Sequence, residues 1–266
     1  MLARGASECI LEPGVSTPKA IYDERYRAGY RKDLGGYERA RWKALEHFVR
    51  SRRLTGVQTV LDYGSGSGLH LELWERLFPR ASLHFTDISA VALQQLAATY
   101  PRHAANTAEL AGDRAPFADA SFDVVVSVEV MEHVEDVRGY LADIFRLLKP
   151  GGQFIWTTPC GNSLSIEHLY NVCTRQIKPT AEGYRLWTWE DPTHLRRLKT
   201  EEVRGLAAEA GFQRVSFKLR SHLFSFACTK LCRGPLRGLG EKMMGLDYSL
   251  FRNLPNGASM LGVAVK

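Results

Sequence analysis

The sequence predicts an α/β fold in which helices cover one doubly wound, mostly parallel sheet of about seven strands. Three observations favour this class. From residue 58 onward, short apolar runs alternate with amphipathic segments, which is typical of parallel strands joined by helices. A glycine-rich turn follows the first apolar run. The length of 266 residues and the hydrophobic content of 45% suit one large domain with insertions.

The chain is expected to begin with a flexible segment, residues 1–20, because Pro13, Gly14 and Pro18 interrupt regular structure there. Residues 22–49 are predicted to be mainly helical. The predicted strands then lie at residues 58–62, 82–86, 104–109, 122–128, 152–158, 212–219 and 259–265. The predicted helices lie at residues 69–78, 89–99, 136–148 and 200–210, the last of them capped by Thr200.

One domain over residues 21–266 is therefore expected, with a ligand-binding core at 58–158 and two insertions. The first insertion, residues 160–198, holds many aromatic and polar side chains and follows the carboxyl end of a strand. We expect it to cover the substrate pocket. The second insertion, residues 220–256, mixes apolar and basic side chains, which suits a membrane-surface element, a cap or a dimer face.

The net charge of +6 is concentrated near the N-terminus, since residues 24–53 hold ten Lys and Arg against four Asp and Glu. The acids between these bases favour a solvated helix face over a surface for an acidic partner. Five cysteines without a C-x-x-C pair indicate reduced thiols. No apolar run approaches the roughly 20 residues of a membrane span. We expect a cytoplasmic protein, with peripheral membrane contact as the alternative.

The most informative stretch is a predicted strand that ends in Asp62 and leads into a turn with Gly64, Gly66 and Gly68 at alternate positions. Glycine lets a ligand approach the backbone, and the N-terminus of the following helix attracts a polar or anionic group. The second predicted strand ends in Asp87, about 20 residues beyond the turn, where nucleoside-binding folds place a carboxylate on ribose hydroxyls. Asp87 also precedes a predicted helix, so a capping role stays open.

A series of ordered motifs extends this pattern through the predicted core. The motifs are Val60–Gly68, Thr86–Ser89, Ala115–Ser127, Glu129–Val134 and Leu147–Gly152. In this order and spacing the chain resembles the class I S-adenosylmethionine-dependent methyltransferases of types 11 and 12. The resemblance implies a Rossmann-like sheet with an antiparallel last strand, and S-adenosyl-L-methionine as the cofactor.

The resemblance also implies how the glycine turn and the second strand bind that cofactor. The turn, including Ser65, would lie against the methionine part, and Asp62 would engage the amino group directly or through water. Asp87 would take both ribose hydroxyls. Ile88 would pack on the adenine.

Three further segments complete the implied cofactor site. Asp113 and Arg114 would pass the adenine edge, although Asp113 lies closer to Pro116 than is common in the family. Glu129, just past a predicted strand, would face the sulfonium end. Tyr26 resembles an N-terminal tyrosine that closes over the cofactor, and a role as a core aromatic is its alternative.

His133 is the first candidate for a catalytic base, because imidazole titrates near neutrality and this residue follows a cofactor strand. Glu129 and His194 are the other catalytic candidates. Packing at the start of the next helix is the alternative for His133. A metal site is a further hypothesis, in which Glu129, Glu132, His133 and His194 bind Mg²⁺ or Zn²⁺. Similar clusters occur in methyltransferases resembling those of ubiquinone biosynthesis and of small-RNA 3′ ends, but relatives without metal share the motif.

The preferred function is O-methylation of a small molecule, a lipid-linked intermediate or a glycan, by a monomer or homodimer. An RNA methyltransferase is one alternative. Nucleic acid is not favoured as the partner, because the sequence has no RNA-binding module and no basic surface interleaved with aromatics. A non-catalytic cofactor-binding scaffold is the other alternative, against which the intact glycine turn and Asp87 argue.

Overall fold

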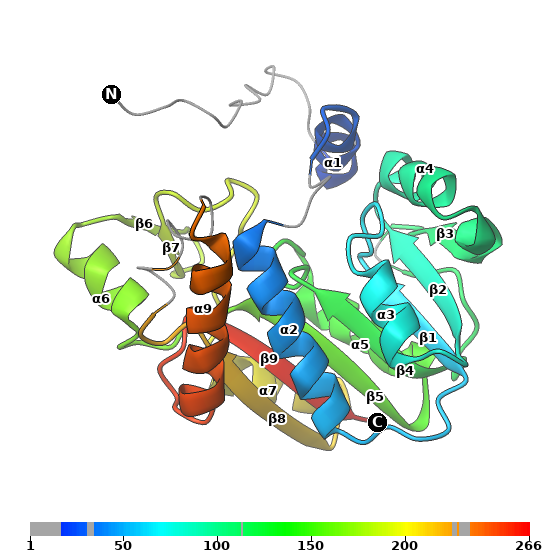
Figure 1. Ribbon diagram of the computed structural model, residues 1–266. Coiled ribbons are helices and arrows are strands. Elements are labelled where there is room, and N and C mark those ends of the chain that lie inside the picture. Colours follow the sequence, from blue (N-terminus) through cyan, green and yellow to red (C-terminus); the bar gives the residue numbers. More distant parts are fainter. Residues whose placement is uncertain (1–16, 31–34, 113, 225–227, 229–234) are drawn as a thin grey trace.

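The computed structural model describes residues 17–30, 35–112, 114–224, 228 and 235–266. A seven-stranded sheet in the order β3-β2-β1-β4-β5-β9-β8 forms its centre (Figure 1). The strands are β1 (Thr59–Tyr63), β2 (Ser82–Asp87), β3 (Thr107–Glu109), β4 (Phe122–Val128), β5 (Leu148–Pro159), β8 (Arg214–Arg220) and β9 (Ser259–Val265). The predicted α/β class and strand number are confirmed.

Strand direction follows the prediction as well. β1 to β5 run parallel, and β9 lies antiparallel between β5 and β8. β4 is rich in buried valine and β1 is buried from Val60 to Tyr63, as expected of strands covered on both faces. The predicted strand at 104–109 is shortened to β3, because Pro101–Asn106 forms a 3₁₀-helix, η1.

Helices cover both faces of the sheet (Figure 1). On one face, α2 (Gly36–Ser51), α3 (Leu71–Leu77), α4 (Ala90–Thr99) and α9 (Arg237–Phe251) share a buried apolar core with the strands. On the other face, α5 (Val137–Leu147) and α7 (Thr200–Glu209) contribute to a second core. Burial of these apolar faces is the main source of stability in such a layered fold.

The N-terminal part differs from its prediction. Helix α1 (Pro18–Arg27) begins inside the segment expected to be flexible, and residues 1–16 lie outside the described part. Pro18 is not a helix breaker here, because it occupies the first helical turn, where a missing N–H costs nothing. The predicted helix at 22–49 is divided into α1 and α2, since the chain leaves the first helix at Ala28 and Gly29 has a φ of 89°.

The first insertion forms α6 (Ile166–Cys173) and a hairpin of β6 (Ile177–Pro179) and β7 (Arg185–Trp187), beyond the edge of the sheet (Figure 1). Its return to the domain corrects one prediction. Thr200 is the first helical residue of α7 rather than the cap, and the backbone N–H of Lys199 donates to the Glu202 carboxylate instead.

The second insertion is described through residue 224, at residue 228 and from residue 235 onward. Its helix α9 packs beside α2 and leaves several leucines exposed on the opposite side. Among the described residues, no helix has the length and apolar character needed to cross a bilayer. Membrane contact by this insertion remains a prediction.

Candidate active site

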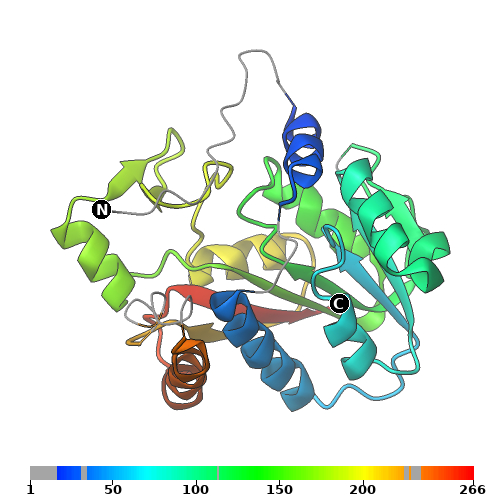
Figure 2. The same ribbon diagram turned by 45° about the horizontal axis from the view of Figure 1, so that its top comes forward.

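The carboxyl ends of β1, β2, β4 and β5 meet at one edge of the sheet, and helix α1 lies above this edge (Figure 2). The turn after β1 starts there with Gly64 and Gly66, both at positive φ. A β-carbon on Gly66 would overlap the hydroxyl group of Tyr26, so glycine is required for the close approach of α1. Tyr26, which is buried, therefore covers the glycine turn.

Asp87 ties the glycine turn to the end of β2. Its Oδ2 accepts a hydrogen bond from the Gly66 N–H at 2.8 Å, and its Oδ1 accepts one from the Ser89 N–H at 2.8 Å. Burial raises the pKa of Asp87 to about 6. The cap of α4 is the hydroxyl of Ser89, not Asp87. Each carboxylate oxygen retains acceptor capacity for a ligand hydroxyl.

Asp62 lies beneath the turn and is almost fully buried. Its Oδ2 accepts a hydrogen bond from the indole N–H of Trp74 at 2.7 Å. Burial raises the pKa of Asp62 to about 7. The carboxylate is thus held by α3, with its side chain at the wall of a small hollow that Ser65 and Gly66 also line.

A larger cavity of about 150 Å³ lies between α1 and the ends of β1, β2 and β4. Tyr26 lines both this cavity and the small hollow, as do Gly64 and Val128, so the two spaces adjoin. The cavity brings together six of the predicted site residues, namely Tyr26, Gly64, Asp87, Ile88, Glu129 and His133. Apolar and aromatic side chains form much of the remaining wall, including Tyr22, Tyr63, Leu110 and Tyr140.

Three predicted cofactor residues are not brought to these cavities. Gly68 packs against Leu96 and Tyr100 of the α4 region. Arg114 is exposed, with its guanidinium 3.9 Å from the Asp119 carboxylate. Asp113 lies outside the described residues.

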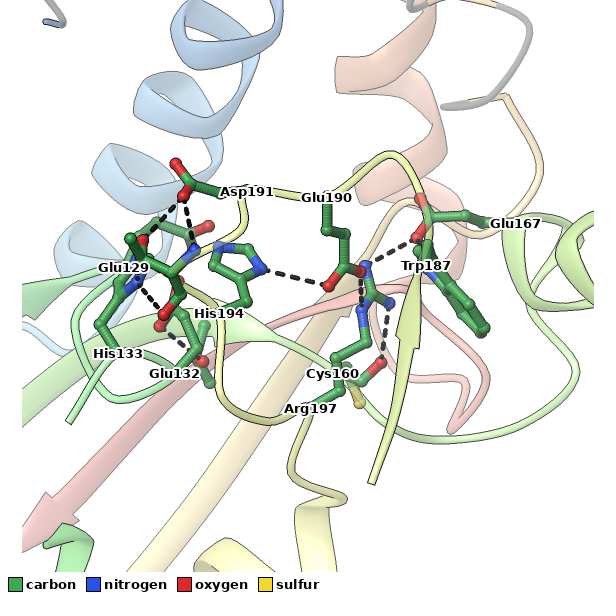
Figure 3. A network of polar contacts seen from close by, with 12 residues as sticks. Glu129, Glu132, His133, Cys160, Glu167, Trp187, Glu190, Asp191, His194 and Arg197 are labelled. Carbon is green, nitrogen blue, oxygen red and sulfur yellow. Dashed lines mark hydrogen bonds and ion pairs between the residues drawn. The ribbon is translucent and has the colours of Figure 1, made fainter. Parts of the chain in front are cut away.

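Glu132, His133 and His194 form a cluster in which one ligand atom from each lies within 4.8 Å of the others (Figure 3). Oε2 of Glu132 accepts a hydrogen bond from the Thr158 hydroxyl at 2.9 Å. Oε1 is buried and has no hydrogen-bond partner in the described part of the chain. Burial and the nearby charge of Glu129 raise the pKa of Glu132.

Glu129 does not join this cluster, which corrects the predicted set of four ligands. Its Oε1 accepts a hydrogen bond from the Thr157 hydroxyl at 2.8 Å, and its Oε2 lies 3.0 Å from Nη2 of Arg41. Thr157 and Thr158 are consecutive in β5, so their side chains point to opposite faces of the sheet. Glu129 is therefore anchored on the α2 side, and Glu132 on the other side.

The first insertion supplies a polar network that sequence reasoning missed (Figure 3). Glu190 contacts Nδ1 of His194 at 3.2 Å and also forms an ion pair with Arg197. Arg197 contacts Glu167 at 2.9 Å, and the indole N–H of Trp187 donates to the same carboxylate at 2.7 Å. Glu167, Trp187 and Arg197 are buried, so the network holds the Glu190 carboxylate and through it positions His194.

Helix α1 is tied to both sides of the cavity. Arg25 donates two hydrogen bonds of 2.8 Å to the two carboxylate oxygens of Asp191 in the first insertion. On the other side, Oδ1 of Asp23 accepts a hydrogen bond of 2.6 Å from Ser89 at the start of α4. The ring of Tyr22 lies edge-on to His133, with centroids 5.9 Å apart. The helix thus bridges the insertion and the core.

Comparisons with known proteins identify the family of this fold. A family model described as a methyltransferase domain matches residues 31–216. The chain is 27% identical over 192 residues to a demethylmenaquinone methyltransferase of Tropheryma whipplei, covering 68% of this chain and 77% of the relative. It is 32% identical over 184 residues to a malonyl-[acyl-carrier protein] O-methyltransferase of Erwinia billingiae, covering 68% and 69%.

Among solved structures, the fold is similar to that of the methyltransferase in complex with the Trm112 methyltransferase activator of Haloferax volcanii. The TM-score is 0.60 at 20% identity, and the match covers 92% of this chain and 96% of the other. This likeness supports the fold alone.

Proposed function

The chain belongs to the methyltransferase domain family and is an S-adenosylmethionine-dependent methyltransferase; from this premise we propose that it methylates a hydroxyl oxygen of a small-molecule acceptor. One observation carries the proposal. A nucleoside-type pocket and two imidazoles, those of His133 and His194, lie together at the carboxyl ends of the strands. One relative is named for a quinone substrate and another for a malonyl group carried on a protein, which supports a small organic group as the acceptor.

The described residues fit the cofactor. The bare backbone of the glycine turn accepts a close ligand, Asp87 offers acceptor atoms for ribose hydroxyls, and Ile88 offers an apolar surface for adenine. Asp62 and Ser65, in the small hollow that Tyr26 also lines, are proposed to receive the amino-acid part. When bound, S-adenosylmethionine supplies an electrophilic methyl group on a sulfonium.

The histidines are proposed to prepare the acceptor. A hydroxyl oxygen must lose its proton as it becomes a nucleophile, and a neutral imidazole within hydrogen-bond reach can take that proton. His194 suits this role because Glu190 engages its Nδ1, which leaves Nε2 as the free acceptor. His133 lines the cavity itself and is proposed to orient the acceptor. Closure by α1 excludes water and holds the reactants in line.

A metal-assisted site is a second candidate, favoured by the compact cluster of Glu132, His133 and His194. The buried Oε1 of Glu132 has no hydrogen-bond partner among the described residues, so this atom is available to bind a cation. Two imidazoles with one carboxylate suit Zn²⁺ better than Mg²⁺, which prefers oxygen ligands. A bound ion would lower the pKa of an acceptor hydroxyl.

A label-transfer assay tests the proposed function. Purified protein and methyl-labelled S-adenosylmethionine are added to a bacterial extract, with and without EDTA, and the label is followed into small-molecule, lipid, glycan and RNA fractions. We expect label in the small-molecule fraction, lost with His133→Asn and retained with His103→Asn, a part-buried histidine that pairs with Glu75 and does not line the cavity. Label confined to RNA would overturn the acceptor class.

EDTA separates the two candidates. Activity that persists in EDTA excludes the metal-assisted site and leaves the base mechanism. Activity that is lost in EDTA and restored by Zn²⁺ supports the metal. The zinc content of the protein, measured before and after Glu132→Gln, gives a readout that does not depend on activity.

A further inference from the structure

We propose that Arg220 and Arg41 form an anion-binding subsite beside the cavity, where the acceptor places a carboxylate or phosphate group. This inference rests on the proposed function, because it names the chemical class of the acceptor for the same site. Its basis is the buried guanidinium of Arg220, for which the described residues offer no hydrogen-bond partner at Nη1 or Nη2 and no contacting carboxylate.

Arg220 is the last residue of β8 and is 3% exposed. Neither Nη1 nor Nη2 has a hydrogen-bond partner among the described residues, and no carboxylate there forms an ion pair with it. Its guanidinium lies over the ring of Tyr37, with Cζ 4.7 Å from the ring centroid. A buried guanidinium with two unpartnered nitrogens is costly, so the site is poised for an anion.

Arg41 adds a second buried guanidinium to the same place. Its Cζ lies 5.4 Å from the centroid of the same Tyr37 ring, so the two arginines share one aromatic surface. Nη2 of Arg41 contacts Glu129 at 3.0 Å. Asp247, whose charge also acts on Arg220, accepts hydrogen bonds from the backbone N–H groups of residues 222–224 and forms no ion pair with Arg220. Arg41 thus has a contacting carboxylate, whereas Arg220 has none among the described residues.

Two hydroxyl groups next to Arg220 also lack partners. Ser259 pairs with Arg220 across the antiparallel ladder of β8 and β9, so both side chains lie on the α2 face of the sheet. The Oγ atoms of Ser221 and Ser259 are buried without hydrogen bonds among the described residues. A guanidinium fork and hydroxyl donors are groups that bind an oxyanion, which arginine can engage in bidentate fashion.

Glu129 connects this subsite with the cavity. It lines the cavity wall and contacts Arg41 directly. The end of β8 and the start of β9 lie at the same sheet edge as the end of β5, because Pro159, Ser259 and Arg220 are in register. An acceptor bound with its hydroxyl toward the histidines would therefore extend its acidic group toward α2.

Thermal unfolding at constant ionic strength tests the subsite with defined probes. Chloride buffer is compared with inorganic phosphate and with malonate, for the wild type, Arg220→Met and Arg102→Met, an exposed arginine paired with Glu75. We expect phosphate or malonate to raise the unfolding midpoint of the wild type and of Arg102→Met by about 2–4 °C over chloride. Arg220→Met should show no such rise. A response to malonate alone identifies a carboxylate acceptor, and one to phosphate alone identifies a phosphate acceptor.

Equal midpoints of the wild type in all three buffers, or a response of Arg220→Met equal to that of the wild type, would overturn the proposal. If Arg220→Met does not fold, Arg220→Lys replaces it, because lysine keeps the charge but lacks the fork. Its response should fall to half or less, and an undiminished response would overturn the subsite. Calorimetric binding of S-adenosylhomocysteine to the same variants separates the proposed function from the anion subsite. If the wild type does not bind S-adenosylhomocysteine, the proposed function is contradicted, while the anion result still stands.

Discussion

The Glu190 carboxylate lies 3.2 Å from Nδ1 of His194, and both side chains are largely shielded from solvent. Burial acts to lower the pKa of His194, but the contact with Glu190 and the charge of Glu132 outweigh it, so the pKa is raised. The same carboxylate is held by Arg197. Glu190 is therefore a positioning residue for His194, and it determines which imidazole nitrogen faces the cluster.

Replacement of Glu190 by Gln should lower kcat about 10–100-fold with little change in the KM for S-adenosylmethionine. The acid limb of the pH–rate profile should move to lower pH, because the neutral amide no longer raises the pKa of His194. Steady-state kinetics from pH 5 to 9 measure both effects. Glu182→Gln, at an exposed partner of Arg196 in the same insertion, is the control and should leave the profile unmoved.

Loss of the Arg25–Asp191 contact should weaken the closure of α1 over the cavity. Arg25→Met removes two charge-assisted hydrogen bonds between partly buried groups, so we expect the dissociation constant for S-adenosylhomocysteine to rise about tenfold. Isothermal titration calorimetry measures the change. Arg27→Met alters the exposed end of the same helix, and an equal loss in that control would show that the Asp191 contact is irrelevant.

Gly66→Ala should weaken S-adenosylhomocysteine binding about 100-fold, because the new methyl group meets the Tyr26 hydroxyl at a backbone φ of 55°. Gly56→Ala places a methyl group at a comparable φ of 69° with open space around it. This variant therefore measures the cost of the backbone strain without a contact to the Tyr26 hydroxyl. Removal of the hydroxyl in the double variant Gly66→Ala/Tyr26→Phe should restore part of the affinity. No rescue would argue against contact between α1 and the turn in solution.

The buried carboxyl of Asp62 should make the ligand-free protein less stable as pH rises. Its pKa is raised from 3.8 to about 7, so the folded state binds more protons than the unfolded state between pH 4 and 7. The stabilising contribution is present below pH 4 and is lost as pH rises through 7. Asp62→Asn keeps an acceptor for Trp74 and should raise the free energy of unfolding at pH 8 by on the order of 2–4 kcal/mol.

Asp123→Asn is the matched comparison for that pH series. The pKa of Asp123 is lowered to about 2: burial alone would raise it, but hydrogen bonds from Lys149, Gln58 and Thr59 outweigh burial. Its contribution to stability is therefore present above pH 4, and this variant should be less stable than the wild type across pH 5–8. Urea unfolding at several pH values measures both variants. Effects of the same sign would contradict the assigned pKa shifts.

The sheet could be predicted from sequence because strand periodicity and the glycine turn are local signals. The start of α1 was missed because Pro18 has opposite meanings inside a helix and at its first turn. The network of Glu190 and Arg197 was also missed, since it joins an irregular loop to distant residues and leaves no periodic pattern.

The predicted metal site shows the same limit of sequence-based prediction for two acids that are close together in the chain. Glu129 and Glu132 are three residues apart, and sequence spacing alone groups them together. In the structure each binds a different face of β5 through Thr157 or Thr158. Which of two neighbouring acids joins a cluster therefore depends on strand register and on Arg41, which lies far away in the sequence.

Calorimetric titration with S-adenosylhomocysteine tests the central claim most directly, namely that the cavity beneath α1 is the cofactor site. The wild type should bind one equivalent. Asp87→Ala should bind at least 100-fold more weakly, while its far-UV circular dichroism stays that of the wild type. Absence of binding by the wild type, or equal affinity of Asp87→Ala, would contradict the assignment of this cavity to S-adenosylmethionine.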